Sequence, residues 1–292
     1  MKKITKKLAA LLLVLALLCG ALAITANAGP ANLAGKKFVV LGDSVAAGIG
    51  ATAEENGYAW IVAKELGLTL ANHAVPGDTT AGLLKILAED KAAQQAIRQA
   101  DIINVSIGGN DLLAANVMRL LTRLLILHDE STLNPVIEEY RKNFAQVVEK
   151  IRTLNSSAML VIQTPYNSME RVLLIEQGYE LVSLRMCKVY DDYLAEHPSA
   201  FVIADLHSAF KGREGLISRD LLHPSDAGHA MIARVVSATI QGKTLQLETP
   251  PAYNPTLWQK ITFFVRTIID YFKHWLSFMS VWELIRNAVS FF

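Results

Sequence analysis

Cysteine is scarce in this sequence. Its 292 residues include only Cys19 and Cys187, and Cys19 lies in an apolar N-terminal stretch that we expect to be removed. The remaining chain would then hold one cysteine and form no internal disulfide. No motif surrounds Cys187, so a small apolar side chain buried on a helix is favoured over a catalytic thiol. A disulfide-stapled scaffold is therefore excluded, and a hydrophobic core has to hold the fold together.

Patterns for binding metal or nucleic acid are also lacking. His223 and His229 have no third ligand at a usual zinc spacing, and no His-Glu-x-x-His motif occurs. Lysine and arginine are scattered among acidic residues instead of forming a basic stripe. Removing residues 1–28, with four lysines and no acid, leaves 24 of the 28 basic residues against 27 acidic ones, a net charge of −3. We expect no metal, no cofactor and no nucleic-acid partner.

The first 28 residues have the layout of an export signal peptide. Four lysines precede an apolar run from Leu8 to about Ile24, and Ala26-Asn27-Ala28 follows. The run is short for a membrane-spanning helix, which needs about 20 residues, and the Ala-x-Ala ending suits signal peptidase. The sequence thus predicts cleavage after Ala28 and an exported protein, secreted or associated with the cell envelope. An uncleaved N-terminal anchor is the alternative.

Strand and helix patterns alternate through the middle of the chain. Short β-branched runs predict five strands, at Phe38–Leu41, Leu68–Ala71, Ile102–Val105, Met159–Ile162 and Phe201–Ala204. Helical spacing predicts Ala53–Leu66, Thr80–Leu87, Ala92–Gln99, Leu112–Leu127, Pro135–Leu154, Glu170–Glu196 and Ser225–Gln241. Five strands alternating with helices indicate one α/β domain over residues 29–247, built on a doubly wound parallel sheet.

Composition changes after residue 247. Residues 248–256 are rich in proline and are predicted to be a linker. Residues 257–292 are dense in aromatic and aliphatic residues. Polar residues interrupt them at steps of three or four, at Gln259, Thr262, Arg266, Asp270, Lys273, Ser277 and Ser280. This spacing predicts an amphipathic helical tail with a wide apolar face, whose charges make a membrane-spanning helix unfavourable.

Three interpretations of this tail stay open. It is a helix in a membrane interface, a helix packed over the domain's own ligand crevice, or a subunit contact. Tryptophan and tyrosine among long aliphatic residues favour peripheral membrane contact. The sequence does not predict the oligomeric state.

Three glycine-containing loops directly follow the first three predicted strands. They are Gly42-Asp43-Ser44, Ala74-Val75-Pro76-Gly77 and Gly108-Gly109-Asn110-Asp111. The carboxyl ends of strands in an open parallel sheet form the ligand crevice, so we expect these loops to converge. Taken singly, each is also an ordinary turn, and His73 and Asp78 beside the second loop are interpreted as turn residues.

A carboxylate and a histidine stand together late in the chain, as Asp220-Leu221-Leu222-His223 before the last predicted helix. A carboxylate that binds one imidazole nitrogen fixes the tautomer and leaves the other nitrogen free to accept a proton from a serine. A serine hydroxyl needs such a base to become a nucleophile. On its own, however, this segment is better interpreted as a loop before a helix capped by Ser225.

Taken together and in this order, the four segments resemble the sequence blocks of the SGNH (GDSL-type) hydrolase family. The resemblance implies a flavodoxin-like three-layer α/β fold and metal-free hydrolysis of esters or thioesters. It assigns Ser44 as the nucleophile, His223 as the general base and Asp220 as the carboxylate that orients His223. It assigns the oxyanion hole to the backbone N–H groups of Ser44 and Gly77 and to the side chain of Asn110. Val45 stands where the family has leucine, and we interpret that position as packing.

Elementary chemistry agrees with these roles. Glycine at position 77 lets the backbone approach a ligand closely, and the Asn110 amide is a donor that stays neutral across pH. The Gly-x-Ser-x-Gly elbow of α/β-hydrolases is absent, since Ala46 stands two residues after Ser44.

The substrate is less determined than the chemistry. The apolar tail favours a lipid-like acyl ester, such as a lysophospholipid or a short-chain ester. O-acetylated carbohydrate or peptidoglycan and thioesters are alternatives, and a binding protein on a hydrolase-like fold is the non-enzyme alternative.

Overall fold

The computed structural model describes residues 33–114, 123, 129–172, 175–250, 256, 258–266 and 269, all within the compact unit Leu33–Phe292. The predicted signal peptide lies outside these residues. Most of the predicted tail also lies outside them. The same is true of the predicted helix Leu112–Leu127 after position 114, except for residue 123.

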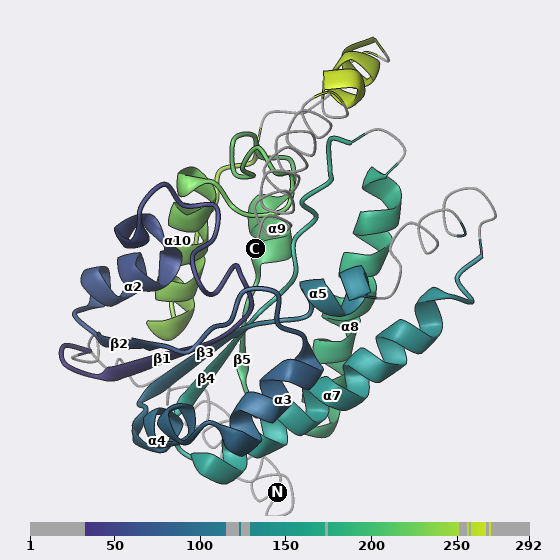
Figure 1. Ribbon diagram of the computed structural model, residues 1–292. Helices are drawn as coiled ribbons and strands as arrows, with labels where there is room; N and C mark the ends of the chain where they lie inside the picture. Colours follow the sequence, from purple (N-terminus) through teal and green to yellow (C-terminus); the bar gives the residue numbers. More distant parts are fainter. Residues whose placement is uncertain are drawn as a thin grey trace, which may run out of the picture. The chain divides into compact units, whose positions relative to one another are not determined.

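A five-stranded parallel sheet forms the centre of the domain (Figure 1). Its strands are β1 (Lys37–Gly42), β2 (Thr69–Asn72), β3 (Ile102–Ser106), β4 (Met159–Gln163) and β5 (Val202–Ala204). The strand order is β2-β1-β3-β4-β5, and every neighbouring pair is parallel. All five predicted strands are confirmed to within one residue at either end. The chain crosses from β2 over β1 to β3, so the topological switch point, where open sheets bind ligands, lies between β1 and β3.

Helices cover both faces of this sheet (Figure 1). One face carries α2 (Tyr58–Leu66), α9 (Leu206–Phe210) and α10 (Asp226–Ile240). The other carries α3 (Thr80–Glu89), α4 (Lys91–Gln99), α7 (Leu133–Leu154) and α8 (Glu176–Glu196). Alternate residues of β1 divide between the two cores: Val39 and Leu41 face the α7 side, and Phe38 and Val40 face the α10 side. The predicted three-layer α/β fold is confirmed.

Helix α8 begins six residues later than predicted. Glu170, the predicted first residue, is held outside the helix because its carboxylate accepts hydrogen bonds from the Gly212 amide at 2.9 and 3.0 Å. Asn167 accepts from the Met169 amide at 3.0 Å and closes a turn ahead of the helix. The prediction was wrong here because a contact 42 residues away in sequence competes with local helical spacing.

Two further helix predictions need correction, and one short helix was missed. The predicted helix Ala53–Leu66 is a 3-10 turn, η1 (Glu54–Asn56), and then α2, because Gly57 between them is extended at φ −66° and ψ 139°. Helix α5 (Gly109–Ala114) starts three residues before the predicted position 112. The five-residue helix α9 was not predicted.

Only a short part of the C-terminal tail is described. Residues 258–266 are helical, and Trp258, Val265 and Ile269 are exposed, with Trp258 at 74%. Ahead of it, the Arg213 guanidinium donates to the Glu248 carbonyl at 2.6 Å. Among the described residues, no helix combines the length and the apolar character needed to cross a membrane.

Candidate active site

Ser44 sits in a tight turn at the end of β1. Gly42 has φ +133°, and a Cβ there would lie 1.9 Å from the Ser106 carbonyl oxygen, so only glycine fits. The Asp43 amide donates to that same carbonyl at 3.0 Å, and the Ile49 amide donates to the Ser44 carbonyl at 2.9 Å. These bonds fix the half-buried Ser44 at the carboxyl ends of β1 and β3, at the switch point.

His223 comes from a loop that is fixed on both sides. The Ser218 amide donates to the His223 carbonyl at 2.8 Å, and Ile217 pairs with Pro224 in an isolated β-bridge. Leu221 is left-handed at φ 65°, a conformation that costs a non-glycine residue roughly 1 kcal/mol. Ser225 then caps α10 by accepting from the Gly228 amide at 3.2 Å. The loop therefore ends on the rigid N-terminus of α10.

Three side chains form a continuous hydrogen-bonded line. Ser44 Oγ lies 2.8 Å from His223 Nε2, and His223 Nδ1 lies 2.6 Å from Asp220 Oδ2. Since a carboxylate only accepts, Nδ1 carries the imidazole proton and Nε2 is the acceptor for the serine hydroxyl. The arrangement can move a proton from Ser44 to His223 while Asp220 stabilises the imidazolium that results.

Hydrogen bonds to its carboxylate favour the ionised form of Asp220. Its Oδ1 accepts from Ser218 Oγ at 2.7 Å and from the Leu222 and His223 amides, both at 2.9 Å. Burial opposes ionisation, but the bonds from Ser218, the His223 ring and the two amides outweigh it and lower the pKa of Asp220 to about 2. Ser218 was not singled out from the sequence, because a serine two residues before an aspartate carries no recognisable signal.

The expected oxyanion residues lie on neighbouring segments, Gly77 in the exposed loop after β2 and Asn110 in the first turn of α5. Asn110 lines the same pocket as Ser44, and its Nδ2 donates to the Asp78 carbonyl at 2.8 Å. One amide hydrogen is thus used to orient the side chain, and the second stays available. Gly77 has φ +85° with open space where a Cβ would stand, and the Val75 amide ties its loop to the Gly42 carbonyl at 2.8 Å.

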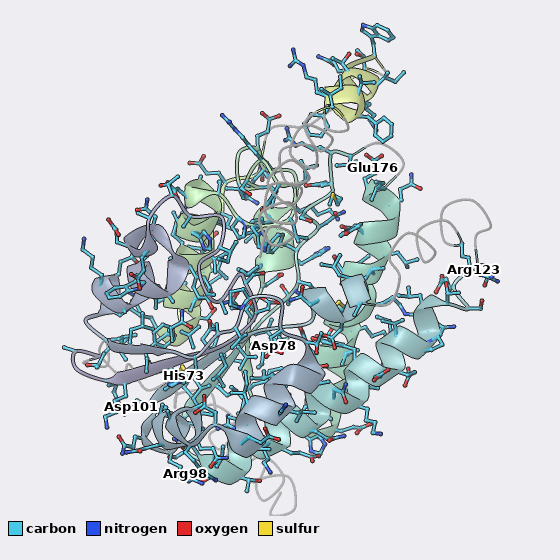
Figure 2. All side chains as sticks on the ribbon, in the orientation of Figure 1. His73, Asp78, Arg98, Asp101, Arg123 and Glu176 are labelled. Atoms are coloured by element: carbon cyan, nitrogen blue, oxygen red, sulfur yellow. The ribbon has the colours of Figure 1, made fainter. Side chains whose placement is uncertain are left out.

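Three carboxyl groups lie around this arrangement: Asp43 is buried, and Asp78 and Asp111 are half-buried. Asp43, only 5% exposed, accepts from the Val45 amide at 3.0 Å, and desolvation raises its pKa to about 7 despite that bond. Asp111 accepts from both the amide, at 3.0 Å, and the hydroxyl of Thr80, which anchors the first turn of α5 to α3. Desolvation also raises the pKa of Asp78 and of Asp111 (Figure 2 labels Asp78). From the sequence, Asp43 and Asp111 were seen only as parts of motifs, and Asp78 was interpreted as a turn residue.

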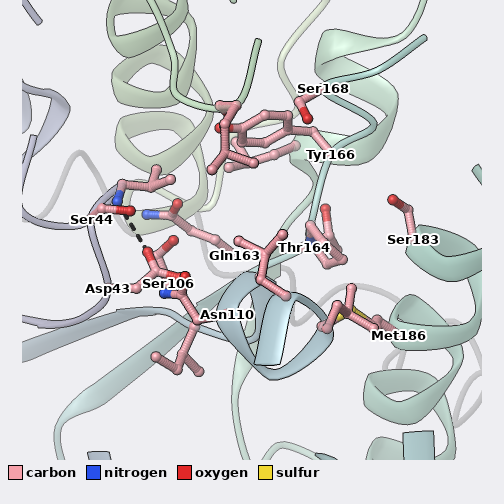
Figure 3. A pocket seen from close by; sticks show the side chains of 18 of the residues that line it. Asp43, Ser44, Ser106, Asn110, Gln163, Thr164, Tyr166, Ser168, Ser183 and Met186 are labelled. Atoms are coloured by element: carbon pink, nitrogen blue, oxygen red, sulfur yellow. Dashed lines mark hydrogen bonds between the residues drawn. The ribbon is translucent and has the colours of Figure 1, made fainter. Parts of the chain in front are cut away.

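An apolar pocket opens from Ser44 and His223 and runs between α5 and α8 (Figure 3). Its walls include Ile107, Leu112, Leu113, Pro165, Tyr166, Tyr179, Val182, Ser183 and Met186. The residues from α8 were not predicted, because apolar residues at helical spacing look the same whether they line a cavity or fill a core.

The remaining residues singled out from the sequence lie elsewhere. His229 is fully buried on α10, where its Nε2 donates to the Ile49 carbonyl at 3.1 Å, and desolvation lowers its pKa. Cys187 is only partly buried on α8, and desolvation raises the pKa of its thiol to about 12, so it is no thiolate at neutral pH. Among the described residues, no group of three His, Cys, Asp or Glu side chains could hold a metal ion.

Comparison with known proteins defines the class. Residues 40–231, more than half of the chain, match the GDSL-like lipase/acylhydrolase family. The chain therefore belongs to this family, the SGNH hydrolases expected from the motifs, and it is a carboxylic ester hydrolase.

Sequence identity to individual relatives is low. The chain is 27% identical to the uncharacterized protein YpmR of Bacillus subtilis, over 72% of this chain and 84% of that one. It is 25% identical to the spore germination lipase LipC of Bacillus licheniformis, over 71% and 97%. The crystal structure of the lipase Lip_vut3 from a goat rumen metagenome has a TM-score of 0.57 at 22% identity, covering 70% of this chain and 98% of that chain. This last likeness supports the fold alone.

Proposed function

We propose that this protein is an exported serine esterase that hydrolyses lipid-like acyl esters through an acyl-serine intermediate. Ser44 is the nucleophile, His223 the general base and Asp220 the carboxylate that orients it. The Ser44 and Gly77 amides and the Asn110 side chain stabilise the oxyanion. The observation that carries this proposal is the Ser44 Oγ to His223 Nε2 contact of 2.8 Å at the mouth of an apolar pocket.

The reaction follows from the geometry in two halves. His223 Nε2 takes the Ser44 proton as Oγ attacks the ester carbonyl, and the carbonyl electrons move onto an oxyanion that the three donors stabilise. Collapse of this intermediate expels the alcohol, which receives the proton from His223, and leaves an acyl-serine. A water then attacks the acyl carbon, again with His223 as the base, and releases the carboxylic acid and free Ser44.

The pocket supports a lipid-like acyl group over an acetyl group. Ser183 and Met186 of α8 lie on the side of the pocket opposite Ser44 (Figure 3), and an acetyl ester has no carbons to occupy that space. The relative LipC is named a lipase, which agrees with this preference. Deacetylation of a carbohydrate or of peptidoglycan, and thioester hydrolysis, are the alternatives.

A panel of p-nitrophenyl esters from acetate to laurate, assayed beside O-acetylated glycans and acyl thioesters, tests the substrate class. We expect the highest kcat/KM on an ester longer than butyrate. Activity confined to acetyl groups would establish the alternative. Failure to hydrolyse any of these compounds, together with no labelling by a fluorophosphonate, would indicate a binding protein.

Location and membrane contact are further parts of the proposal. The N-terminal lysines, apolar run and Ala26-Asn27-Ala28 support export with cleavage before Gly29. N-terminal sequencing of the mature protein tests this, and a retained Met1 would contradict it. The exposed apolar side chains of the tail support binding at a membrane interface.

A further inference from the structure

We propose that Met186 is the end wall of the acyl-binding pocket and sets the length of the acyl chain that the enzyme accepts. This inference rests on the proposed esterase function and adds a specificity-determining residue to it. It starts from where Met186 lies. Figure 3 shows Ser44 and Asn110 on one side of the pocket and Ser183 and Met186, both on α8, on the opposite side.

Met186 separates the pocket from the core of the domain. It lines the pocket, yet it is only 1% exposed and packs in the same hydrophobic cluster as Tyr140. The absence of a side chain at Gly108 allows this contact. A Cβ on Gly108 would lie 2.5 Å from Met186 Cε and 2.7 Å from Tyr140 Cε2. Met186 and Tyr140 therefore both pack against Gly108, immediately before the helix that carries Asn110.

The structure behind Met186 is rigid. Tyr140 and Tyr190 are fully buried, their hydroxyls lie 2.6 Å apart, and the Tyr140 hydroxyl donates to the Ile107 carbonyl at 3.3 Å. Moving either ring would leave buried polar groups without partners. Met186 makes no such bond, and its unbranched side chain is the adaptable part of this wall. The pocket thus ends at Met186, and a smaller residue there lengthens it.

The acyl group, and not the alcohol, is the part of the substrate that fits this pocket. Helix α5 begins at Gly109, carries Asn110 and continues into the wall through Leu112 and Leu113. The pocket is thus continuous with the proposed oxyanion donor, which contacts the acyl carbonyl. The acyl group also stays attached to Ser44 through the second half of the reaction, when the alcohol has left.

Two substitutions that should change the preferred acyl-chain length in opposite directions test the inference. Methionine has three more side-chain heavy atoms than alanine, so Met186→Ala should move the preferred acyl chain about three carbons longer. The ratio of kcat/KM on that longer ester to kcat/KM on butyrate should rise about tenfold or more, because each methylene that fits is worth at least about tenfold. Ser183→Leu fills the pocket from α8 and should lower the same ratio about tenfold. Leu184→Ala, at a neighbouring residue that is 48% exposed and lies outside the pocket, is the matched control and should leave the ratio unchanged.

The measurement uses two ester series on the full chain, with circular dichroism of every variant. One series varies the acyl chain on p-nitrophenol, and the other varies the alcohol on acetate. A shift in the acyl series alone is the expected result. Unchanged acyl profiles in folded Met186→Ala and Ser183→Leu, or a shift confined to the alcohol series, would overturn the inference. If Met186→Ala does not fold, Ser183→Leu decides alone. A wild-type protein that hydrolyses neither series defeats the proposed function itself, which is a different result from an unchanged profile.

Discussion

Ser44 Oγ and His223 Nε2 lie 2.8 Å apart although 179 positions separate the two residues. Their distance depends on how the turn after β1 packs against the loop before α10. Gly50 is the point of closest approach, because a Cβ there would lie 2.2 Å from the Pro224 carbonyl oxygen and 2.9 Å from His223 Cβ. The Gly50 segment cannot retreat easily, since His229 binds the adjacent Ile49 carbonyl at 3.1 Å.

Gly50→Ala should therefore displace His223 and lower kcat by about 10²-fold, the usual effect of a misplacement near 1 Å. Gly50 has φ +98°, so a control has to separate backbone strain from the clash. Gly35→Ala provides it, because Gly35 has φ +77° and nothing within 4 Å of a Cβ. Steady-state kinetics and thermal unfolding of both variants test this. Equal kcat in the two variants would show that the contact with His223 is unimportant.

Replacing Asn110 tests the oxyanion hole. Asn110→Ala should lower kcat by about 10²–10³-fold with little change in KM, because an oxyanion donor acts on charge that develops in the transition state. Asn110→Asp keeps the shape but replaces the donor by a carboxylate oxygen, so it should be at least as severe. An effect confined to KM in both variants would contradict this role for Asn110.

The motifs and the sheet could be predicted from the sequence, but the pocket could not. The run Phe38–Leu41 in β1 is apolar at every position because both faces of the strand are buried, and such a run is readable without a structure. The turn after β1 was predicted because Gly42-Asp43-Ser44 resembles a family block. The physical reason for its glycine, a Cβ position 1.9 Å from the Ser106 carbonyl oxygen, is visible only in the fold.

Features that depend on distant contacts escaped prediction. The start of α8 is set by the bond between Glu170 and the Gly212 amide, and the cavity wall is set by the packing of Met186 and Tyr140 against Gly108. Neither contact leaves a periodic signal in the sequence. The support of Asp220 by Ser218 escaped prediction for a different reason. The two residues are only two positions apart, but a serine at that spacing carries no signal until the folded loop brings its hydroxyl within 2.7 Å of the carboxylate.

Asp43 should make stability depend on pH. Its pKa in the folded protein is raised to about 7 from the usual 3.8, so the folded state holds its proton more tightly than the unfolded state. This contribution to stability is complete below about pH 4 and is lost as pH rises through 7. Asp43→Asn stays neutral and can still accept from the Val45 amide, so it should exceed the wild type in stability at pH 8, by on the order of a few kcal/mol.

Urea unfolding of both proteins between pH 4 and pH 8 measures this difference, which should shrink towards zero at pH 4. Asp90→Asn, at the exposed N-cap of α4, is the control for a carboxylate outside the active site. If Asp43→Asn had a lower free energy of unfolding than the wild type, by the same amount at every pH, the result would contradict a raised pKa of Asp43.

The tail should bind lipid surfaces through its exposed apolar side chains. The full-length protein is expected to co-sediment with anionic liposomes, and the double substitution Trp258→Glu and Val265→Glu should release it, because charge is costly in the acyl boundary. Gln259→Glu adds a negative charge at a neighbouring polar position and should have little effect. Hydrolysis of a soluble ester should be unchanged in all three proteins. Absence of wild-type protein from the liposome pellet would favour a packing or subunit role for the tail.

The most direct test of the central claim is the site of covalent modification by a fluorophosphonate. Wild-type protein should gain one adduct, which peptide mapping assigns to Ser44. Ser44→Ala should gain none and should lose ester hydrolysis by about 10⁴-fold or more with unchanged circular dichroism. An adduct on another residue, or a folded Ser44→Ala protein with more than a few per cent of wild-type activity, would contradict the assignment of Ser44 as the nucleophile.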